Sequence, residues 1–283
     1  MIKVDTIIKN IKELLTLKGP NRPRYGKEMS ELGIMNNISI AINEGKIIDI
    51  ASLQDLMNKY EATQTIDASN YVVMPGFVDP HTHPVFVNTR ENEFEMRIMG
   101  KSYVEISQSG GGILSSIKAV REASEEELFN LAKKRIMKMI EYGTTTLEAK
   151  SGYGLTTESE IKMLRVIKQL QEELPIDIVA TLMGAHEIPQ EYRHDREAYI
   201  RLMEDEMMPE VKRQDLAEYV DIFTEAHVYG IEESRRILKK AKELGFKIRM
   251  HADEIEAIGG AELAGELNAV SADHLGACSD EGI

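Results

Sequence analysis

From Tyr71 onward the chain alternates short apolar runs with amphipathic segments, and this alternation constrains the fold more than any other feature. Apolar runs bounded by turn residues predict strands, and apolar side chains at helical spacing predict the helices between them. The expected strands are residues 71–78, 144–150, 176–185, 219–225, 246–250 and 269–273. Strands separated by helices predict parallel βαβ units, and hence an α/β fold with a TIM-like (β/α)8 barrel of which about six strands are present.

Capping residues place the helix ends. Ser124 with Glu127 and Thr157 with Glu160 have the spacing of capping boxes, so we expect helices to begin there. The second of these helices runs to about residue 174, and further helices are expected over 232–244 and 260–267. Gly245 is placed to end the third helix, because glycine is favoured just after a helix.

Residues 1–70 predict a small β-rich unit, and residues 71–283 the barrel. The expected strands of the first unit are 5–11, 38–43 and 46–51, with a hairpin turn at Glu44 and Gly45 and a short helix near 53–60. This unit has no residue pattern that indicates chemistry.

Composition restricts the classes of partner. The 283 residues carry 48 acidic and 34 basic side chains, a net charge of −14, which argues against nucleic acid and anionic membrane surfaces. We find no run of about 18 apolar residues and no signal peptide. The single cysteine, Cys278, excludes an internal disulfide and predicts a cytoplasmic protein. An anionic substrate would need a cationic side chain nearby to overcome the repulsion from this net negative charge.

A long polar segment follows the first barrel strand and contains Ser109-Gly-Gly-Gly112. It does not match a dinucleotide-binding fingerprint, because no strand directly precedes it. We expect a loop over the mouth of a site.

Histidines follow most of the expected strands. His81 and His83 are two positions apart, so in a strand both imidazoles point to one face. The histidines at 186, 227, 251 and 274 lie at or beside the ends of later strands, which converge in a (β/α)8 barrel. His81, His83 and His251 therefore predict a site for one zinc or iron ion. The alternative is that these are ordinary loop or core histidines.

Two further side chains are candidates for catalysis. Glu254 follows His251 by three residues and suits proton transfer from a metal-activated water to a leaving nitrogen. His274 suits a hydrogen bond to a developing oxyanion, or orientation of the water. The alternatives are a surface carboxylate for Glu254 and a core histidine for His274.

Substrate contacts are expected near the same strand ends. Arg90 is suited to grip a carboxylate, and the alternative is a solvated loop arginine. Tyr153 lies between glycines on a strand-end loop, where ligand contact and plain loop packing are equally open. Lys150 we interpret as structural, although a modified lysine can bridge two metals in some hydrolases. The role of His227 stays open.

These residues lie in segments that resemble a known family. Residues 75–84, PGFVDPHTHP, resemble the first-strand signature of the amidohydrolase superfamily. The segments 102–106, 110–113, 148–154, 184–186, 251–254 and 271–274 make the pattern similar to the imidazolonepropionases, which act in histidine degradation. The resemblance covers about residues 71–283, and the first 70 residues match more loosely as the N-terminal part of a composite β-sandwich domain.

The resemblance implies hydrolysis of the cyclic amide of 4-imidazolone-5-propanoate to N-formimidoyl-L-glutamate, with one zinc or iron ion. It places the metal on His81, His83 and His251. It matches substrate-contact positions to Arg90, Tyr153, His186 and Glu254, and a catalytic position to His274. The implied partners are this small-molecule substrate and, as a candidate, a second copy of the chain in a homodimer.

The chain departs from the family after its sixth expected strand. The aspartate ligand of the eighth strand is absent, and Ser279 to Ile283 predict only a helix cap and first turn. Six strands cannot close an eight-stranded barrel and would leave an unpaired edge. We therefore expect a C-terminally incomplete chain that is inactive alone and prone to aggregate.

Two alternatives to this function stay open. A deaminase of the same superfamily acting on a nitrogen heterocycle also uses a His-x-x-Glu motif, but Arg90 and Tyr153 favour a substrate with a carboxylate. A non-catalytic remnant that keeps the fold would be expected to lose the general base or the histidine pair, and Glu254, His81 and His83 are all present.

Overall fold

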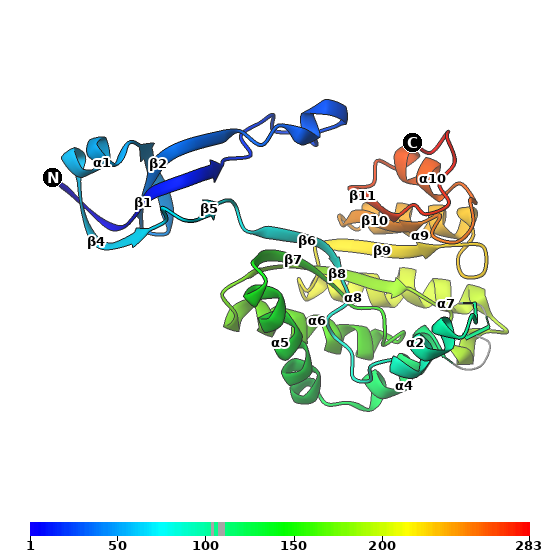
Figure 1. The fold of residues 1–283 in the computed structure, drawn as a ribbon. Coiled ribbons are helices and arrows are strands. Elements are labelled where there is room, and N and C mark those ends of the chain that lie inside the picture. Colours follow the sequence, from blue (N-terminus) through cyan, green and yellow to red (C-terminus); the bar gives the residue numbers. More distant parts are fainter. Residues whose placement is uncertain (103–104, 107–110) are drawn as a thin grey trace. The chain divides into compact units, whose positions relative to one another are not determined.

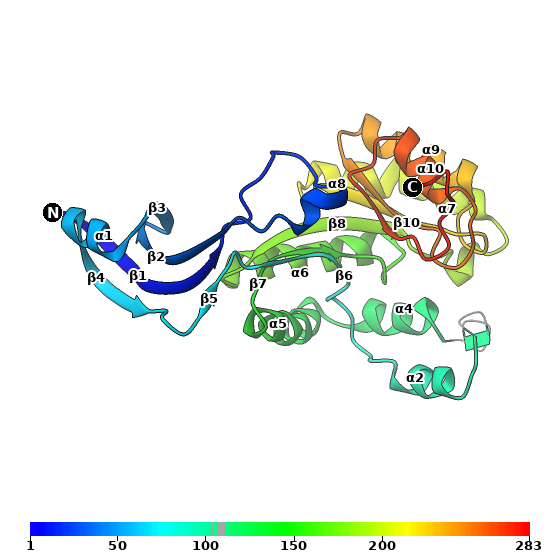
Figure 2. The same ribbon diagram turned by 45° about the horizontal axis from the view of Figure 1, so that its top comes forward.

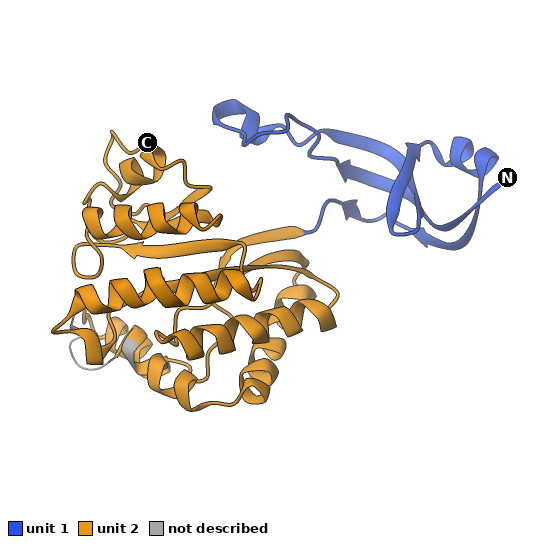
Figure 3. Ribbon diagram, turned by 180° about the vertical axis from the view of Figure 1, so that it is seen from behind, with its two compact units in different colours: residues 1–76 blue, residues 77–283 orange. Residues whose placement is uncertain are grey.

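The computed structural model describes residues 1–102, 105–106 and 111–283, and backbone contacts divide the chain into two units, Met1–Gly76 and Phe77–Ile283 (Figure 3). The sequence predicts a boundary after residue 70. The difference arises because Val72 and Val73 pair with the first strand of unit 1. The apolar run 71–78, expected to be one strand, is therefore split between two sheets.

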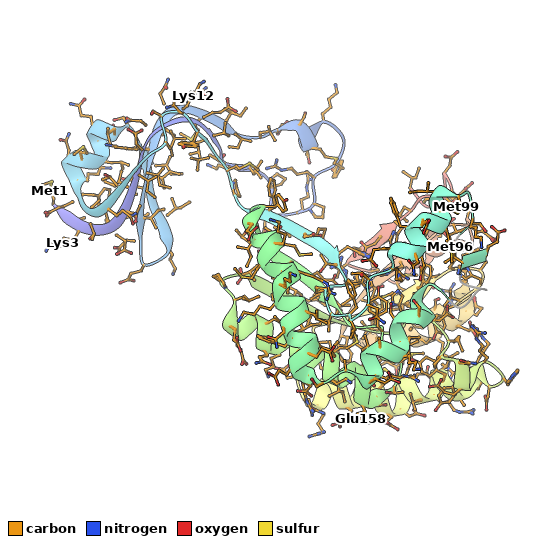
Figure 4. All side chains as sticks on the ribbon, turned by 60° about the horizontal axis from the view of Figure 1, so that its bottom comes forward. Met1, Lys3, Lys12, Met96, Met99 and Glu158 are labelled. Atoms are coloured by element: carbon orange, nitrogen blue, oxygen red, sulfur yellow. The ribbon has the colours of Figure 1, made fainter. Side chains whose placement is uncertain are left out.

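Unit 1 is a β-sheet with one α-helix. Its elements are β1 (Ile2–Leu15), a 3₁₀ turn (Gly26–Ser30), β2 (Ile34–Asn43), β3 (Lys46–Ala51), α1 (Leu53–Lys59), β4 (Tyr60–Asp67) and β5 (Val72–Val73). β1 pairs antiparallel with β2 and parallel with β4 and β5. Lys3 and Lys12, labelled in Figure 4, lie on β1. β2 pairs antiparallel with β3 across the predicted hairpin, where Glu44 and Gly45 have φ of 50° and 70°. The predicted strands are confirmed, whereas β4 was not predicted.

Unit 2 consists of strands that alternate with helices. Its elements are β6 (Phe77–Thr82), α2 (Glu91–Ile98), α4 (Ile113–Glu122), α5 (Glu125–Glu141), β7 (Thr144–Lys150), α6 (Thr157–Glu173), β8 (Asp177–Ala185), a 3₁₀ turn (Gln190–Tyr192), α7 (Arg196–Leu202), a π-helical turn (Met203–Met207), α8 (Met208–Arg213), β9 (Tyr219–Thr224), α9 (Ile231–Glu243), β10 (Lys247–Ala252), α10 (Gly260–Glu266) and β11 (Ser271–His274).

The strands of unit 2 form one parallel sheet. Among the described residues it has six strands, which follow one another in chain order from β6 to β11 (Figure 1). Helices pack on the strands that precede or follow them, as α5 does on β7, α6 on β8 and α9 on β9 and β10. The predicted parallel βαβ architecture of a barrel is thereby confirmed.

The helix starts show one prediction confirmed and one wrong. The Ser124 hydroxyl accepts the Glu127 N–H at 3.1 Å, so α5 begins where predicted. The cap of α6 is Thr156, one residue before the predicted Thr157, and its hydroxyl accepts the Ser159 N–H at 3.2 Å. Glu160 is not part of this cap. Glu158 lies in the first turn of α6 (Figure 4).

The segment between β6 and α5 contains α2 and α4, two helices that were not predicted. α2 and α4 lie side by side (Figure 2), joined by the Glu93 carboxylate, which accepts the Gly112 N–H at 2.9 Å. Ser109 and Gly110 of the predicted loop, and parts of the motifs at 102–106 and 110–113, lie outside the described residues. Near the last residue, the Ser279 hydroxyl accepts the Gly282 N–H at 3.1 Å and closes a turn.

No helix in the described part of the chain is both long enough and apolar enough to cross a membrane.

The core of unit 2 gives a test of the fold. Leu128 in α5 is fully buried, and its replacement by alanine should destabilise the unit by about 2–5 kcal/mol, because a cavity remains. Met137, on the same helix and 38% exposed, is the control; Met137→Ala should change stability by about 0.5 kcal/mol or less. Thermal unfolding followed by circular dichroism measures both variants. Equal losses in the two variants would contradict the assigned face of α5.

Candidate metal centre

Five histidines from four strand ends surround one space. His81 lies near the end of β6 and His83 just after it, His186 follows β8, His251 lies in β10, and His274 ends β11. The ring centroids of His81 and His251 are 4.4 Å apart, those of His83 and His186 are 5.0 Å apart, and those of His251 and His274 are 4.9 Å apart. The predicted convergence of histidines at strand ends is therefore present in the fold.

Carboxylates orient two of these rings. His81 Nδ1 lies 2.9 Å from Asp273 Oδ2, and His251 Nδ1 lies 3.1 Å from Asp221 Oδ1. When the Nδ1–H donates to a carboxylate, Nε2 carries the lone pair that a metal ion needs. Both aspartates were missed in the sequence, where nothing in their local pattern marks them as partners of distant histidines.

The other two buried rings are oriented differently. His186 Nδ1 donates to the Gly152 carbonyl at 2.9 Å, which leaves its Nε2 as an acceptor. His83 Nε2 lies 3.3 Å from His251 Nε2, and His83 Nδ1 is buried with no hydrogen-bond partner among the described residues. Neutral imidazole nitrogens gathered in this way have the chemistry of a ligand set for a cation.

The protonation state supports this arrangement. Burial, above all, lowers the pKa of His83 well below its ordinary value and lowers that of His186 to about 3. Burial also lowers the pKa of His251, against the opposing effect of Asp221. These three imidazoles are therefore neutral near pH 7, which is the form that ligates metal.

Two groups of histidines offer ligand atoms within 4.8 Å of one another, so the cluster could bind a metal ion. The described residues give His81, His251 and His274 as one group and His83, His186 and His251 as the other. His251 is common to both. The predicted set of His81, His83 and His251 is neither of these groups; it takes two members from each, and its ring centroids lie 4.4–5.4 Å apart.

A layer of buried charge lies next to the histidines. The Lys150 ammonium is fully buried and donates to Glu148 at 2.7 Å and to Asp221 at 2.6 Å. Arg249 lies 3.4 Å from Asp273 Oδ2 and donates to the Pro80 carbonyl at 2.6 Å. Burial favours the protonated form of Asp221, but His251 and Lys150 outweigh it and hold the pKa of this carboxyl well below its usual value.

The loop that carries Tyr153 is fastened to α6 by one side chain. The fully buried Glu160 carboxylate accepts the backbone N–H groups of Gly152 at 2.9 Å and of Gly154 and Leu155 at 2.8 Å each. The Tyr153 ring consequently lies beside the histidines, with its centroid 5.2 Å from that of His186 and 5.8 Å from that of His83. The role of Glu160 was hidden in the sequence by its spacing, which fits a capping box.

Arg90 is the N-cap residue of α2, and its Nε lies 3.7 Å from Glu93. Its charge acts on Tyr153: burial raises the pKa of the Tyr153 hydroxyl, and Arg90 partly offsets this. The structure therefore brings Arg90 and Tyr153 to the same region.

Glu254 and His274 form a pair. Glu254 Oε2 lies 3.7 Å from His274 Nε2, and both side chains are partly exposed. The fully buried Glu225 fixes the loop that bears Glu254 by accepting the Ile255 N–H at 2.9 Å. His227, whose role the sequence leaves open, has its ring centroid 5.8 Å from that of Phe223.

Comparison with known proteins identifies the family. A model described as the amidohydrolase family matches residues 72–281. An imidazolonepropionase from Clostridium tetani (strain Massachusetts / E88) is 50% identical over 100% of this chain and 68% of its own length. The chain belongs to the imidazolonepropionase family of amidohydrolases. Imidazolonepropionases from Alkaliphilus metalliredigens and Bacillus velezensis are 46% and 47% identical, over 98% and 99% of this chain and 66% of each relative.

This member of the imidazolonepropionase family thus spans about two thirds of the length of the curated relatives it matches. Solved structures share its fold. Ochratoxinase from A. niger has a TM-score of 0.59 at 12% identity, covering 98% of this chain and 61% of its own. A 5-methylcytosine deaminase from Klebsiella pneumoniae has a TM-score of 0.59 at 16% identity, covering 91% and 55%. These likenesses establish the amidohydrolase-type barrel fold.

The anchoring by Glu160 can be tested without a ligand. In Glu160→Gln, one acceptor oxygen becomes an NH₂ group that faces a backbone N–H, so the loop should loosen. We expect amide hydrogen exchange at Gly152, Gly154 and Leu155 to accelerate by about tenfold or more, the equivalent of about 1.4 kcal/mol. Glu158→Gln, at an exposed side chain in the first turn of the same helix, is the control and should leave these amides protected. Unchanged exchange in Glu160→Gln would contradict the anchor.

Proposed function

We propose that this chain carries the metal-binding and substrate-binding residues of an imidazolonepropionase. The reaction is hydrolysis of the cyclic amide of 4-imidazolone-5-propanoate to N-formimidoyl-L-glutamate. The observation that supports this most directly is the gathering of strand-end histidines beside Glu254, in a chain whose curated relatives carry that name. The cytoplasmic location and the homodimer stay predictions.

We assign one zinc or iron ion to His81, His83 and His251. The neutral state of His83 and His251, and the carboxylate partners of His81 and His251, support this assignment. When bound, the ion would lower the pKa of a water molecule and polarise the amide carbonyl. His186 and His274 then remain free to act on the substrate.

Glu254 and His274 have separate roles in the reaction. Glu254 takes a proton from the attacking water and passes it to the ring nitrogen that leaves the carbonyl carbon. His274 donates a hydrogen bond to the oxygen on which negative charge develops. Their separation of 3.7 Å supports this division of roles, because one reacting carbonyl can lie within reach of both.

Arg90, Tyr153 and His186 bind the substrate. The guanidinium of Arg90 grips the propanoate, for which a planar fork is better suited than a point charge. The Tyr153 hydroxyl donates to the substrate, and His186 presents the Nε2 lone pair to a ring N–H, since its Nδ1 is engaged by Gly152. The overall negative charge of the chain makes a local arginine necessary for an anionic substrate.

The competing function is deamination of a nitrogen heterocycle, and one assay separates the two. The protein, supplied with zinc or iron, should consume 4-imidazolone-5-propanoate. The same preparation should release no ammonia from cytosine or guanine. Ammonia release without turnover of the imidazolone would overturn the proposal. The likeness to a deaminase structure at 16% identity concerns the fold alone.

Glu254→Gln tests the proton transfer. The variant should keep its metal and lose about 10²–10⁴-fold in kcat, because the proton can no longer be accepted. Glu256→Gln, an exposed acid in the same loop, is the matched control and should keep normal turnover. Metal content is measured alongside kcat. Near-normal turnover in Glu254→Gln would remove Glu254 from the mechanism.

Arg90→Lys tests the grip on the carboxylate. A rise in KM with a modest change in kcat is expected, if the contact is the same in the ground and transition states. Arg97→Lys, in the last turn of the same helix α2, serves as the control. An unchanged KM would mean that another residue holds the propanoate.

A further inference from the structure

The amino group of Lys150, at the end of β7, contacts several buried acids at once. Its side chain is fully buried, and Nζ donates to Glu148 Oε1 at 2.7 Å and to Asp221 Oδ2 at 2.6 Å. Asp273 Oδ2 lies 3.9 Å from the same nitrogen. A buried charge is retained in a fold only when it is paired, and here one ammonium is shared by acids from different strands.

Two of these acids also hold histidines. Asp221 uses Oδ1 for His251 Nδ1 and Oδ2 for Lys150, so both of its oxygens are engaged. Asp273 uses Oδ2 for His81 Nδ1, on the side that faces Lys150. The ammonium therefore lies between the carboxylates that orient a ring on β10 and a ring on β6.

We propose that Lys150 is a positioning residue for the metal centre. Its ammonium fixes the carboxylates of Asp221 and Asp273, and these hold the imidazoles of His251 and His81 with Nε2 directed at the ion. This inference rests on the metal site proposed above. It adds to that site a residue that contacts no metal itself, Lys150, and that links the proposed ligands His81 and His251 through their carboxylate partners.

The contacts of Lys150 distinguish this role from that of a metal ligand. An amine that bridges metals must first lose its proton and react at nitrogen, whereas this nitrogen donates to two carboxylates at 2.6–2.7 Å. Loss of the ammonium would leave Asp221 Oδ2 without this donor, while Oδ1 keeps His251 and the Ile222 N–H at 2.7 Å, so the carboxylate would be held through one oxygen instead of two. Partners in the layer behind metal ligands typically contribute 10–100-fold in affinity, through ring orientation and ligand basicity.

The test uses cobalt(II) as a probe of the proposed metal site. Its dissociation constant is measured by competition with a chelator, and its visible absorption spectrum reports ligand geometry. Lys150→Met should weaken cobalt binding about 10–100-fold and change the spectrum. Lys162→Met is the control: this half-buried lysine donates to the carbonyls of Arg121 and Ala123, and its loss should change neither quantity.

A double-mutant cycle tests whether Lys150 acts through Asp221. If it does, Lys150→Met should have a much smaller effect on cobalt affinity in an Asp221→Asn background than in the wild type. Lys150→Gln, which keeps an N–H donor without the charge, is measured in parallel in case the methionine variant does not fold. Its expected affinity lies between those of the wild type and Lys150→Met.

The outcomes separate the two proposals. A wild-type protein that binds no cobalt would overturn the metal site itself and this inference with it. Wild-type binding, with affinity and spectrum unchanged in folded Lys150→Met or Lys150→Gln, would overturn only the positioning role. Additive effects of the Lys150 and Asp221 substitutions would also overturn it, since independent sites do not couple.

Discussion

The hydrogen bond between His81 and Asp273 joins the first and last strands of the parallel sheet, and the site depends on the curvature that allows it. In a flat sheet, five strand spacings of about 4.8 Å would hold β6 and β11 about 24 Å apart. The contact of 2.9 Å therefore requires the sheet to curl, as barrel sheets do. Arg249 on β10, bound to the Pro80 carbonyl on β6, spans the same gap.

Curvature of the sheet brings imidazoles close to imidazoles and acids close to acids. This arrangement is stable because the imidazoles are neutral and the acids are paired with buried cations. Imidazoles whose nitrogens lie 3.3 Å apart would repel one another if both were protonated, and burial lowers the pKa of each and so favours the neutral form. The acids behind them are compatible with burial only because Lys150 and Arg249 lie among them. The neutral imidazoles and the paired charges next to them thus stabilise the buried cluster together.

The sequence predicted the parts that depend on local pattern. Apolar runs and their spacing predicted the strands of the sheet, and histidines that follow or end four of these strands are the ones that come together in the structure. Helix α2 was missed because Glu91–Ile98 is polar and has no buried residue to create periodicity. β4 was missed for the same reason, since its side chains are mostly exposed.

Contacts between residues far apart in the chain could not be predicted from the sequence. Asp221 is 30 residues from His251, and Asp273 is 192 residues from His81, so no local motif joins them. Glu160 was assigned to a cap because its spacing from Thr157 allows it, and only the path of the loop shows that its carboxylate turns to Gly152, Gly154 and Leu155. Thr156 forms the cap instead, because its backbone is extended there and its hydroxyl reaches Ser159.

The attachment of this loop to α6 has a consequence for recognition. A tyrosine on a free loop would have to be ordered when a ligand arrives, and immobilising such a side chain costs about 0.5–1.5 kcal/mol of affinity. Because Glu160 binds the backbone on both sides of Tyr153, that ordering is completed when the protein folds. For the substrate contact proposed above, the tyrosine is thus already in place before a ligand arrives.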